Sequence, residues 1–260
     1  EMIKIMLSPH PSCGFYYLKD TGLLQLIMPE LCELDKVETR CGRSHKNNYD
    51  HTMEVLENVC RQTNNLWLRW AALLHDIGKP RSKRWDNLAG WTFRNHNVVG
   101  AHMIPTMFRR MKLPMDAKMK YVQKLVELHM RPIVISDEEV TDSAVRRLLN
   151  DAGDDIDDLM TLCEADITSK NQVRKQHFLD NFRLVRQKIA DLKVRDYKRL
   201  FQPCIDGCEI MEIFHLGSCP EVGALKQALK DAVLDGKVAN EREPLMQLLM
   251  QKAKEHGLVE

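Results

Sequence analysis

The chain has 260 residues, 44% of them hydrophobic and 29% charged, and its formal net charge is +1. This length and composition predict one large domain or two small ones with a buried core. A net charge this close to zero gives no reason to expect a polyanionic partner. No apolar run is long enough to cross a membrane, so no membrane partner is expected.

Helical signals dominate the sequence from one end to the other. Helices are predicted at residues 2–7, 51–61, 66–76, 97–112, 116–130, 142–151, 155–165 and 169–192, with three shorter helices within 203–260. The glycines at 207, 217, 223 and 236 are expected to separate the helices of this last segment. Residues 18–28 form a further apolar stretch with a break at Thr21-Gly22, and Pro29 is expected to open another turn. One short hairpin, from Trp85 to Phe93 around Gly90, is the exception to the helical pattern. The expected fold is all-α.

Several of the predicted helices have recognisable ends. Asp50 is placed to cap the helix over residues 51–61. Gly78 and Pro80 are expected to end the helix over residues 66–76. Pro132 is expected to end the helix over residues 116–130.

The eight cysteines are scattered and form no CxxC pair. They therefore predict reduced thiols in a cytoplasmic protein, without a structural zinc site. The chain starts at Glu1, not at a methionine, so it is expected to be a fragment of a longer protein.

The most informative segment is Leu73-Leu74-His75-Asp76-Ile77-Gly78-Lys79-Pro80. It places a histidine next to an aspartate at the end of an apolar helix, and these two side chains offer mixed nitrogen and oxygen ligands to a divalent metal ion. Lys79 follows closely enough to contact a phosphate. The pattern indicates a metal-dependent phosphohydrolase with Asp76 and Lys79 in catalytic roles.

One ion needs ligands from several helices, because neighbouring side chains on one helix diverge by about 100°. His51 precedes His75 by 24 residues, so a pair of antiparallel helices would bring the two side chains into one pocket. Asp166, near the end of another predicted helix, is the expected closing carboxylate. His96 and His129 are predicted to bind a second metal ion, with Asp76 as a bridge, or to donate hydrogen bonds to a phosphate.

Charge is distributed unevenly along the second half of the chain. Residues 137–166 contain eleven acidic side chains, and residues 168–200 contain ten lysines and arginines. Two solvated helix faces of opposite sign would explain this pattern. The alternative is an RNA-binding surface on a basic helix over residues 170–199. Its candidate residues are Arg174, Lys175, Arg183, Arg186 and Lys188.

The residues at 51, 75, 76 and 166 resemble the His…His-Asp…Asp signature of the HD phosphohydrolase superfamily. Further segments resemble bacterial class II CCA-adding tRNA nucleotidyltransferases and their poly(A) polymerase relatives. These segments are Gly22-Leu23-Leu24 with Met28-Pro29-Glu30-Leu31, Tyr49-Asp50-His51-Thr52, Trp70 to Pro80, Phe93…His96…Gly100-Ala101, and Leu234-Asp235-Gly236-Lys237-Val238.

The resemblance implies the C-terminal part of such an enzyme. It would comprise a helical RNA-binding body segment (residues 1–40), an HD metal-dependent phosphohydrolase domain with the basic helix (41–200) and a small helical tail (201–260). The nucleotide-adding head, with its Gly-Ser loop and paired aspartates, has no counterpart in this sequence. ATP and CTP would therefore serve only the full-length enzyme, which builds the 3′ end of tRNA.

For this chain the resemblance implies tRNA as a partner and a phosphorylated nucleotide or RNA 3′ end as substrate. Expected activities are those of a 2′,3′-cyclic phosphodiesterase, a 2′-nucleotidase or a phosphatase. The ligand set suits Mn, Mg, Ni, Co or Fe. Two alternatives stay open: a free-standing HD nucleotide phosphohydrolase without an RNA role, and a non-enzymatic RNA-binding module. The oligomeric state is not predicted.

Overall fold

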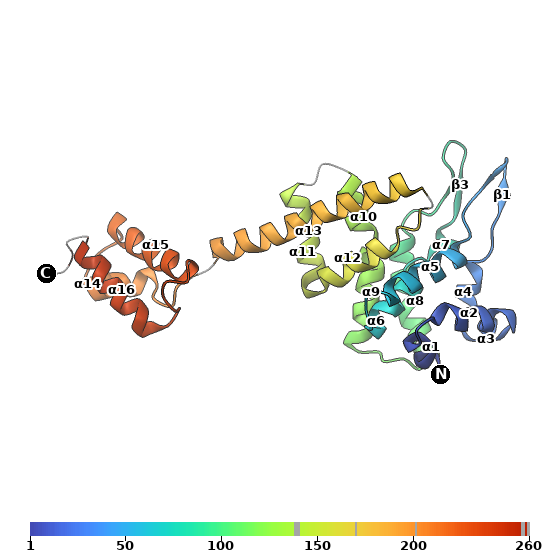
Figure 1. The fold of residues 1–260 in the computed structure, drawn as a ribbon, viewed down its shortest axis with the longest axis horizontal. Coiled ribbons are helices and arrows are strands. Elements are labelled where there is room, and N and C mark those ends of the chain that lie inside the picture. Colours follow the sequence, from blue (N-terminus) through green and yellow to red (C-terminus); the bar gives the residue numbers. More distant parts are fainter. Residues whose placement is uncertain (138–140, 170, 201, 256–257, 259–260) are drawn as a thin grey trace. The chain divides into compact units, whose positions relative to one another are not determined.

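The computed structural model describes residues 1–137, 141–169, 171–200, 202–255 and 258. It divides into two compact units, Glu1–Ile189 and Ala190–Glu260, and helix α13 (Gln172–Leu200) carries residues of both. The all-α prediction is confirmed, since helices make up most of the fold and the strands form only two small hairpins (Figure 1). Among the described residues, no helix combines the length and the apolar character needed to cross a bilayer.

The first unit contains the following helices besides the start of α13: α1 (Met2–Leu7), α2 (Pro11–Asp20), α3 (Leu23–Ile27), α4 (Pro29–Glu33), α5 (Asn48–Cys60), α6 (Leu66–Leu74), α7 (Lys79–Ser82), α8 (His96–Arg110), α9 (Ala117–Leu128), α10 (Met130–Asp137), α11 (Asp142–Ala152) and α12 (Ile156–Ala165). A short 3-10 helix, Gly153–Asp155, joins the last two. Figure 1 shows α5, α6, α8, α9 and α12 gathered as one bundle.

Helix α6 lies at the centre of this bundle. Every residue from Leu68 to Leu74 is buried, including the two bulky side chains Trp70 and Leu73. A helix that is buried on all sides has to be surrounded by others, and α5, α9 and α12 pack around α6. The side chain of Asn65 fixes the start of α6 by accepting hydrogen bonds from two backbone N–H groups of the first turn.

The N-terminal helices pack directly on the bundle. Arg69 on α6 is buried and donates hydrogen bonds to the carbonyl oxygens of Met6 (2.8 Å), Ser8 and Thr63. The phenol of Tyr49 on α5 donates to the carbonyl oxygen of Phe15 (3.0 Å). These polar contacts give hydrogen-bond partners to backbone carbonyl groups that would otherwise be buried away from water without one. Residues 1–34 and the bundle therefore share one core.

The structure corrects several predicted element boundaries. Helix α5 begins at Asn48 and is capped by Asn47, whose side chain accepts from two backbone N–H groups; the predicted cap, Asp50, lies inside the helix. Pro132 does not end a helix but sits in the first turn of α10, where its missing N–H costs nothing. Gly223 lies inside a helix of the second unit and does not separate two helices.

Two antiparallel hairpins extend from the first unit (Figure 1). The predicted one is confirmed as β3 (Arg84–Asp86) paired with β4 (Gly90–Thr92), with Trp85 opposite Trp91. The other hairpin, β1 (Thr39–Arg40) with β2 (Arg43–Ser44), was not expected, since its two-residue strands are too short to produce an alternating pattern.

The second unit holds α14 (Gly207–Phe214), α15 (Pro220–Leu234) and α16 (Arg242–Glu255). Its own small core consists of Ile205, Ile210, Val222, Leu225, Leu229, Leu245 and Leu249.

All eight cysteines of the chain are free thiols.

A partly buried ion pair joins α4 to α8. Arg110 donates to both carboxylate oxygens of Glu30, with Nη1 at 2.9 Å from Oε1. Burial alone would raise the pKa of Glu30, but the hydrogen bonds from Arg110 outweigh it and lower that pKa. A carboxyl group with a lowered folded-state pKa adds stability above its unfolded pKa, and this stability is lost as the pH falls through the folded-state value.

Glu30→Gln is therefore expected to reduce the free energy of unfolding at pH 7 by about 1 kcal/mol, a modest value because Arg110 is 37% exposed. The difference from the unsubstituted protein should shrink as the pH falls below about 4, where the unfolded carboxyl is protonated. Urea unfolding at pH 7 and at pH 3.5 measures both values. Glu1→Gln, which removes a largely exposed ion pair with Lys4, is the matched control and should change neither value.

Candidate metal centre

The centre is built at the C-terminal end of α6. The apolar residues of α6 continue into His75 and Asp76, which have exposed fractions of 0% and 1%. Backbone hydrogen bonds from Ile77 to Leu74 and from Lys79 to Asp76 then turn the chain into α7. Two ionisable side chains are thereby taken out of water at a helix end, a position that is costly without a charge partner or a metal ion.

Gly78 brings this turn against α8. A Cβ atom added at Gly78 would lie 2.0 Å from the carbonyl oxygen of His96 and 2.6 Å from the backbone N of Gly100. The backbone at Gly78 has φ −81°, so this position requires glycine for space and not for a left-handed turn. The close approach sets His96, at the first turn of α8, beside the His75-Asp76 pair.

Three histidines of the centre are oriented in the same way. In His75, His96 and His129, Nδ1 donates to the backbone carbonyl three residues earlier, at 2.8, 2.8 and 2.7 Å. A carbonyl oxygen can only accept, so the proton of each neutral ring sits on Nδ1. The Nε2 lone pairs are left for a ligand, which is the arrangement that backbone carbonyls impose on metal-binding histidines.

His51 joins this group from α5, together with Asp166, which follows the last residue of α12. The Nε2 atom of His51 lies 2.8 Å from Oδ1 of Asp166, and Nε2 of His75 lies 3.5 Å from the same oxygen. These three residues form one set whose ligand atoms all lie within 4.8 Å of one another. Asp76, His96 and His129 form a second such set.

Asp76 touches both sets. Its Oδ2 lies 3.3 Å from Nε2 of His75 and 3.6 Å from Nε2 of His51, and its Oδ1 lies 3.3 Å from Nε2 of His96. The two oxygens of one carboxylate thus face different ligand groups, as a carboxylate that bridges two ions would. The ammonium of Lys79, the residue predicted to contact a phosphate, lies 2.6 Å from Oδ2 of Asp76.

The donor atoms fit a cation. Nε2 of His75 is fully buried and, among the described residues, makes no hydrogen bond. The Nε2 atoms of His96 and His129 lie only 3.3 Å apart, although both rings carry their proton on Nδ1. Two lone pairs this close repel each other unless a positive charge lies between them. Nitrogen ligands about 2.1 Å from one ion would be about 3.0–3.4 Å apart at ordinary coordination angles.

The carboxylates of the centre dominate its electrostatics. Burial would raise the pKa values of Asp76 and Asp166, but the neighbouring histidines, and Lys79 beside Asp76, hold both well below the usual range. Burial would lower the pKa of His75, yet the two carboxylates raise it to about 10. Burial and the charge of His75 lower the pKa of His129 to about 4. The site therefore attracts positive charge, while His129 remains neutral and able to bind an ion.

Two residues that the sequence did not single out support His51. Thr168 Oγ1 lies 3.0 Å from Nδ1 of His51, and Lys46 Nζ lies 3.3 Å from the same nitrogen. Lys46 also donates to Thr168 at 2.7 Å. Thr168 stands two residues after Asp166, which is the one signal in the sequence that would have found it. Nothing in the sequence indicates Lys46.

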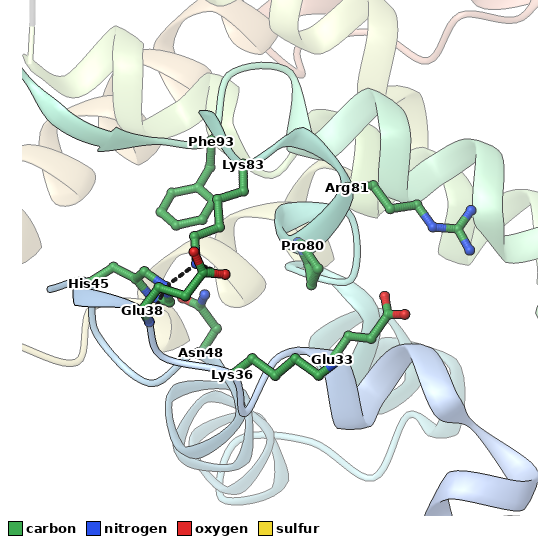
Figure 2. A pocket seen from close by; sticks show the side chains of 9 residues that line it. All are labelled: Glu33, Lys36, Glu38, His45, Asn48, Pro80, Arg81, Lys83 and Phe93. Carbon is green, nitrogen blue, oxygen red and sulfur yellow. Dashed lines mark hydrogen bonds and ion pairs between the residues drawn. The ribbon is translucent and has the colours of Figure 1, made fainter. Parts of the chain in front are cut away.

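A cavity of about 250 Å³ opens beside the turn that carries Lys79, and Figure 2 shows the side chains that line it. In it, Lys83 donates to His45 (2.7 Å) and pairs with Glu38 (3.0 Å). Arg81 lines the other side of Pro80 and, among the described residues, its side chain makes no hydrogen bond or ion pair. Glu38 thus compensates the positive charge of Lys83 directly, whereas the charge of Arg81 acts on the carboxylate of Glu30 without an ion pair.

The five candidate RNA-binding residues all lie on α13, in the part assigned to the first unit. Arg186 pairs with Glu164 (2.6 Å), and Arg183 pairs with Asp180 on the same helix. The guanidinium of Arg174 lies over the ring of Phe178. Lys175 and Lys188 complete the set. Lys170, where the predicted basic helix begins, and the side chain of Arg199, where it ends, lie outside the described residues.

Two families match the chain. Residues 48–171 match the family described as HD domain, and residues 1–34 match the one described as "Probable RNA and SrmB- binding site of polymerase A". The HD match contains all six residues of the two ligand sets. An HD domain implies a divalent metal ion, in agreement with the fit of the donor atoms.

Similar proteins include the A-adding tRNA nucleotidyltransferase of Deinococcus radiodurans, 29% identical over 94% of this chain and 55% of that protein. The CC-adding tRNA nucleotidyltransferase of Thermus thermophilus is 29% identical over 94% of this chain and 54% of that protein. The multifunctional CCA protein of Ralstonia nicotianae is 32% identical over 45% of this chain and 27% of that protein.

The chain spans about half the length of the two relatives that match most of it. The resemblance seen in the sequence and these matches agree on a C-terminal part with an RNA-binding segment followed by an HD domain. The chain therefore contains an HD domain preceded by an RNA-binding segment, and over 94% of its length it is similar to tRNA nucleotidyltransferases.

Proposed function

We propose that the centre between α5, α6, α8, α9 and α12 is the active site of a divalent-metal phosphohydrolase. His51, His75, Asp76 and Asp166 would hold the ion. His96 and His129, with Asp76 as the shared ligand, would hold a second ion or the phosphate. The observation that carries this proposal is the convergence of the Nε2 atoms of His75, His96 and His129 around the buried carboxylate of Asp76.

A bound divalent ion supplies a water molecule of lowered pKa and a Lewis acid for a phosphoryl oxygen. The chain's own residues do the remaining work. Asp76 would hold the two ligand groups next to each other, because one of its oxygens faces His75 and the other faces His96. Lys79, whose side chain is 20% exposed, would move its ammonium from Asp76 to a phosphate once an ion neutralises that carboxylate.

The substrates we propose are phosphorylated nucleotides or RNA 3′ ends, with 2′,3′-cyclic phosphodiesterase, 2′-nucleotidase or phosphatase activity. The names of the relatives support tRNA as the partner. Residues 1–40 would contribute to its binding together with Arg174, Lys175, Arg183, Arg186 and Lys188, since basic side chains on one helix can follow a phosphate backbone. Arg186 would contribute least, because Glu164 already neutralises it.

In the longer protein, nucleotide addition from ATP and CTP would belong to a part outside this chain. The HD domain is proposed to cover residues 41–200 and the tail residues 201–260. A cytoplasmic location is part of this proposal.

A metal screen tests the phosphohydrolase. The chain is stripped with EDTA and supplied separately with Mn, Mg, Ni, Co or Fe. Hydrolysis of adenosine 2′,3′-cyclic phosphate, adenosine 2′-monophosphate and β-glycerol phosphate is then followed by phosphate release and chromatography. We expect turnover with at least one ion and none in EDTA. Stoichiometric metal binding without turnover of any of the three substrates would contradict the enzyme and favour a non-enzymatic module.

A further inference from the structure

A second cavity, of about 270 Å³, begins where the metal centre meets solvent. Asp166 lines it, and the side chain of Asp166 is 16% exposed, compared with 2% for Asp76 and 0% for His75. Thr168, which contacts Nδ1 of His51, lines the cavity as well. Two residues thus belong both to the cavity wall and to the metal centre, so a ligand in the cavity would lie next to the ion.

Two aromatic side chains also line the cavity. Phe178 and Phe182, one helical turn apart on α13, both line it. Phe182 is 1% exposed and anchored in the core, while Phe178 is only partly buried. The guanidinium carbon of Arg174 lies 5.6 Å from the centre of the Phe178 ring, and this side chain also lines the cavity.

This combination of groups selects one ligand chemistry. Aromatic rings stack on flat ring systems, and every nucleobase has such a face. Arg174 adds a cation that can stack on a base or pair with a phosphate. A purely apolar ligand would have no use for Arg174 or for the hydroxyls of Thr168 and Ser169. The volume lies near the lower end of small-molecule pockets, which suits one base better than a longer segment.

We propose that this cavity is the base subsite of the phosphohydrolase, so that the substrate is a nucleotide or terminal nucleoside and not a base-free phosphate ester. The base would stack on Phe178 while its phosphate reaches the ion beside Asp166. This inference rests on the proposed function, because it takes the phosphate-binding end of the site as given.

The kinetic test compares two substrates of different structure. Phe178→Leu keeps the apolar bulk but removes the ring, and Phe178→Tyr keeps the ring. We expect Phe178→Leu to raise KM for adenosine 2′-monophosphate about tenfold, as for a lost base–aromatic stack. Its kcat, and both constants for β-glycerol phosphate, should stay within about twofold, and Phe178→Tyr should behave like the unsubstituted chain. Leu184→Ala, at a 55% exposed position on α13 outside the cavity, is the matched control.

A binding measurement without turnover separates the two proposals. In EDTA, saturation-transfer NMR should show magnetisation reaching the base protons of adenosine 2′-monophosphate, and Phe178→Leu should abolish this transfer. Equal effects of Phe178→Leu on both substrates, or base protons that receive no saturation, would overturn the base subsite. Saturation of the base without hydrolysis of either substrate would refute the phosphohydrolase but keep the subsite. If β-glycerol phosphate is hydrolysed as fast as adenosine 2′-monophosphate and the base protons receive no saturation, the base subsite is refuted and the phosphohydrolase is kept.

Discussion

Asp76→Asn is expected to reduce metal-dependent phosphate release by about 10³-fold or more, on the order of 4 kcal/mol in the barrier. The reason is geometric: Asp76 is the residue whose two oxygens contact both ligand groups. An amide of the same shape offers one oxygen and no charge. The buried histidines that Asp76 faces would then lose both the bridge and the charge that attracts the ion.

Initial rates with the best ion of the metal screen, together with metal content by mass spectrometry, measure this effect. Circular dichroism establishes that the variant folds. Asp116→Asn is the matched control, because it makes the same chemical change at an exposed helix N-cap where asparagine caps equally well. Normal turnover and full metal content in Asp76→Asn would rule out the proposed centre, whatever the control does.

Gly78→Ala is expected to destabilise the first unit by about 3 kcal/mol or more. The added methyl group would meet the carbonyl oxygen of His96 at 2.0 Å. The backbone fixes the position of a Cβ atom, and the carbonyl is itself part of the backbone, so no side-chain rotation can relieve the contact. Overpacking of this kind forces elements apart. Since α8 carries His96 and the turn carries Asp76, we also expect the variant to bind metal more weakly than its loss of stability alone would explain.

Tryptophan fluorescence in a urea titration isolates this unit, because all four tryptophans lie between residues 67 and 91. Gly223→Ala provides the contrast. It lies inside α15 with nothing within 4 Å of an added Cβ, so alanine should stabilise that helix by about 0.5–1 kcal/mol, visible by circular dichroism. If Gly78→Ala unfolds at the same urea concentration as the unsubstituted chain, the close approach is not a structural requirement.

The two effects share a cause. The centre depends on helix ends that are held together by a narrow backbone contact, and not on a continuous ligand motif along one element. Gly78 fixes the distance between the His75-Asp76 turn and α8, and the i−3 carbonyl bonds fix how the rings face. If either the Gly78 contact or the carbonyl hydrogen bonds were lost, the ligand side chains would all be present but would no longer converge on one point.

The sequence by itself determined that this chain is helical, because apolar spacing and helix-ending residues are local properties. It also indicated His51, His75, Asp76 and Asp166 as partners, and the structure brings them together. The hairpin around Gly90 could also be predicted from the sequence, because its signals lie in neighbouring residues.

Only the tertiary structure decided what each side chain meets. It places Thr168 on His51 and Glu164 on Arg186, and both contacts join atoms whose separation depends on how whole elements pack. The same holds for the role of Gly78: a local pattern predicted a turn residue, whereas the contact that excludes a Cβ comes from α8, about twenty residues later. Periodicity along a chain carries no information on such distances, because they arise when separate helices share one core.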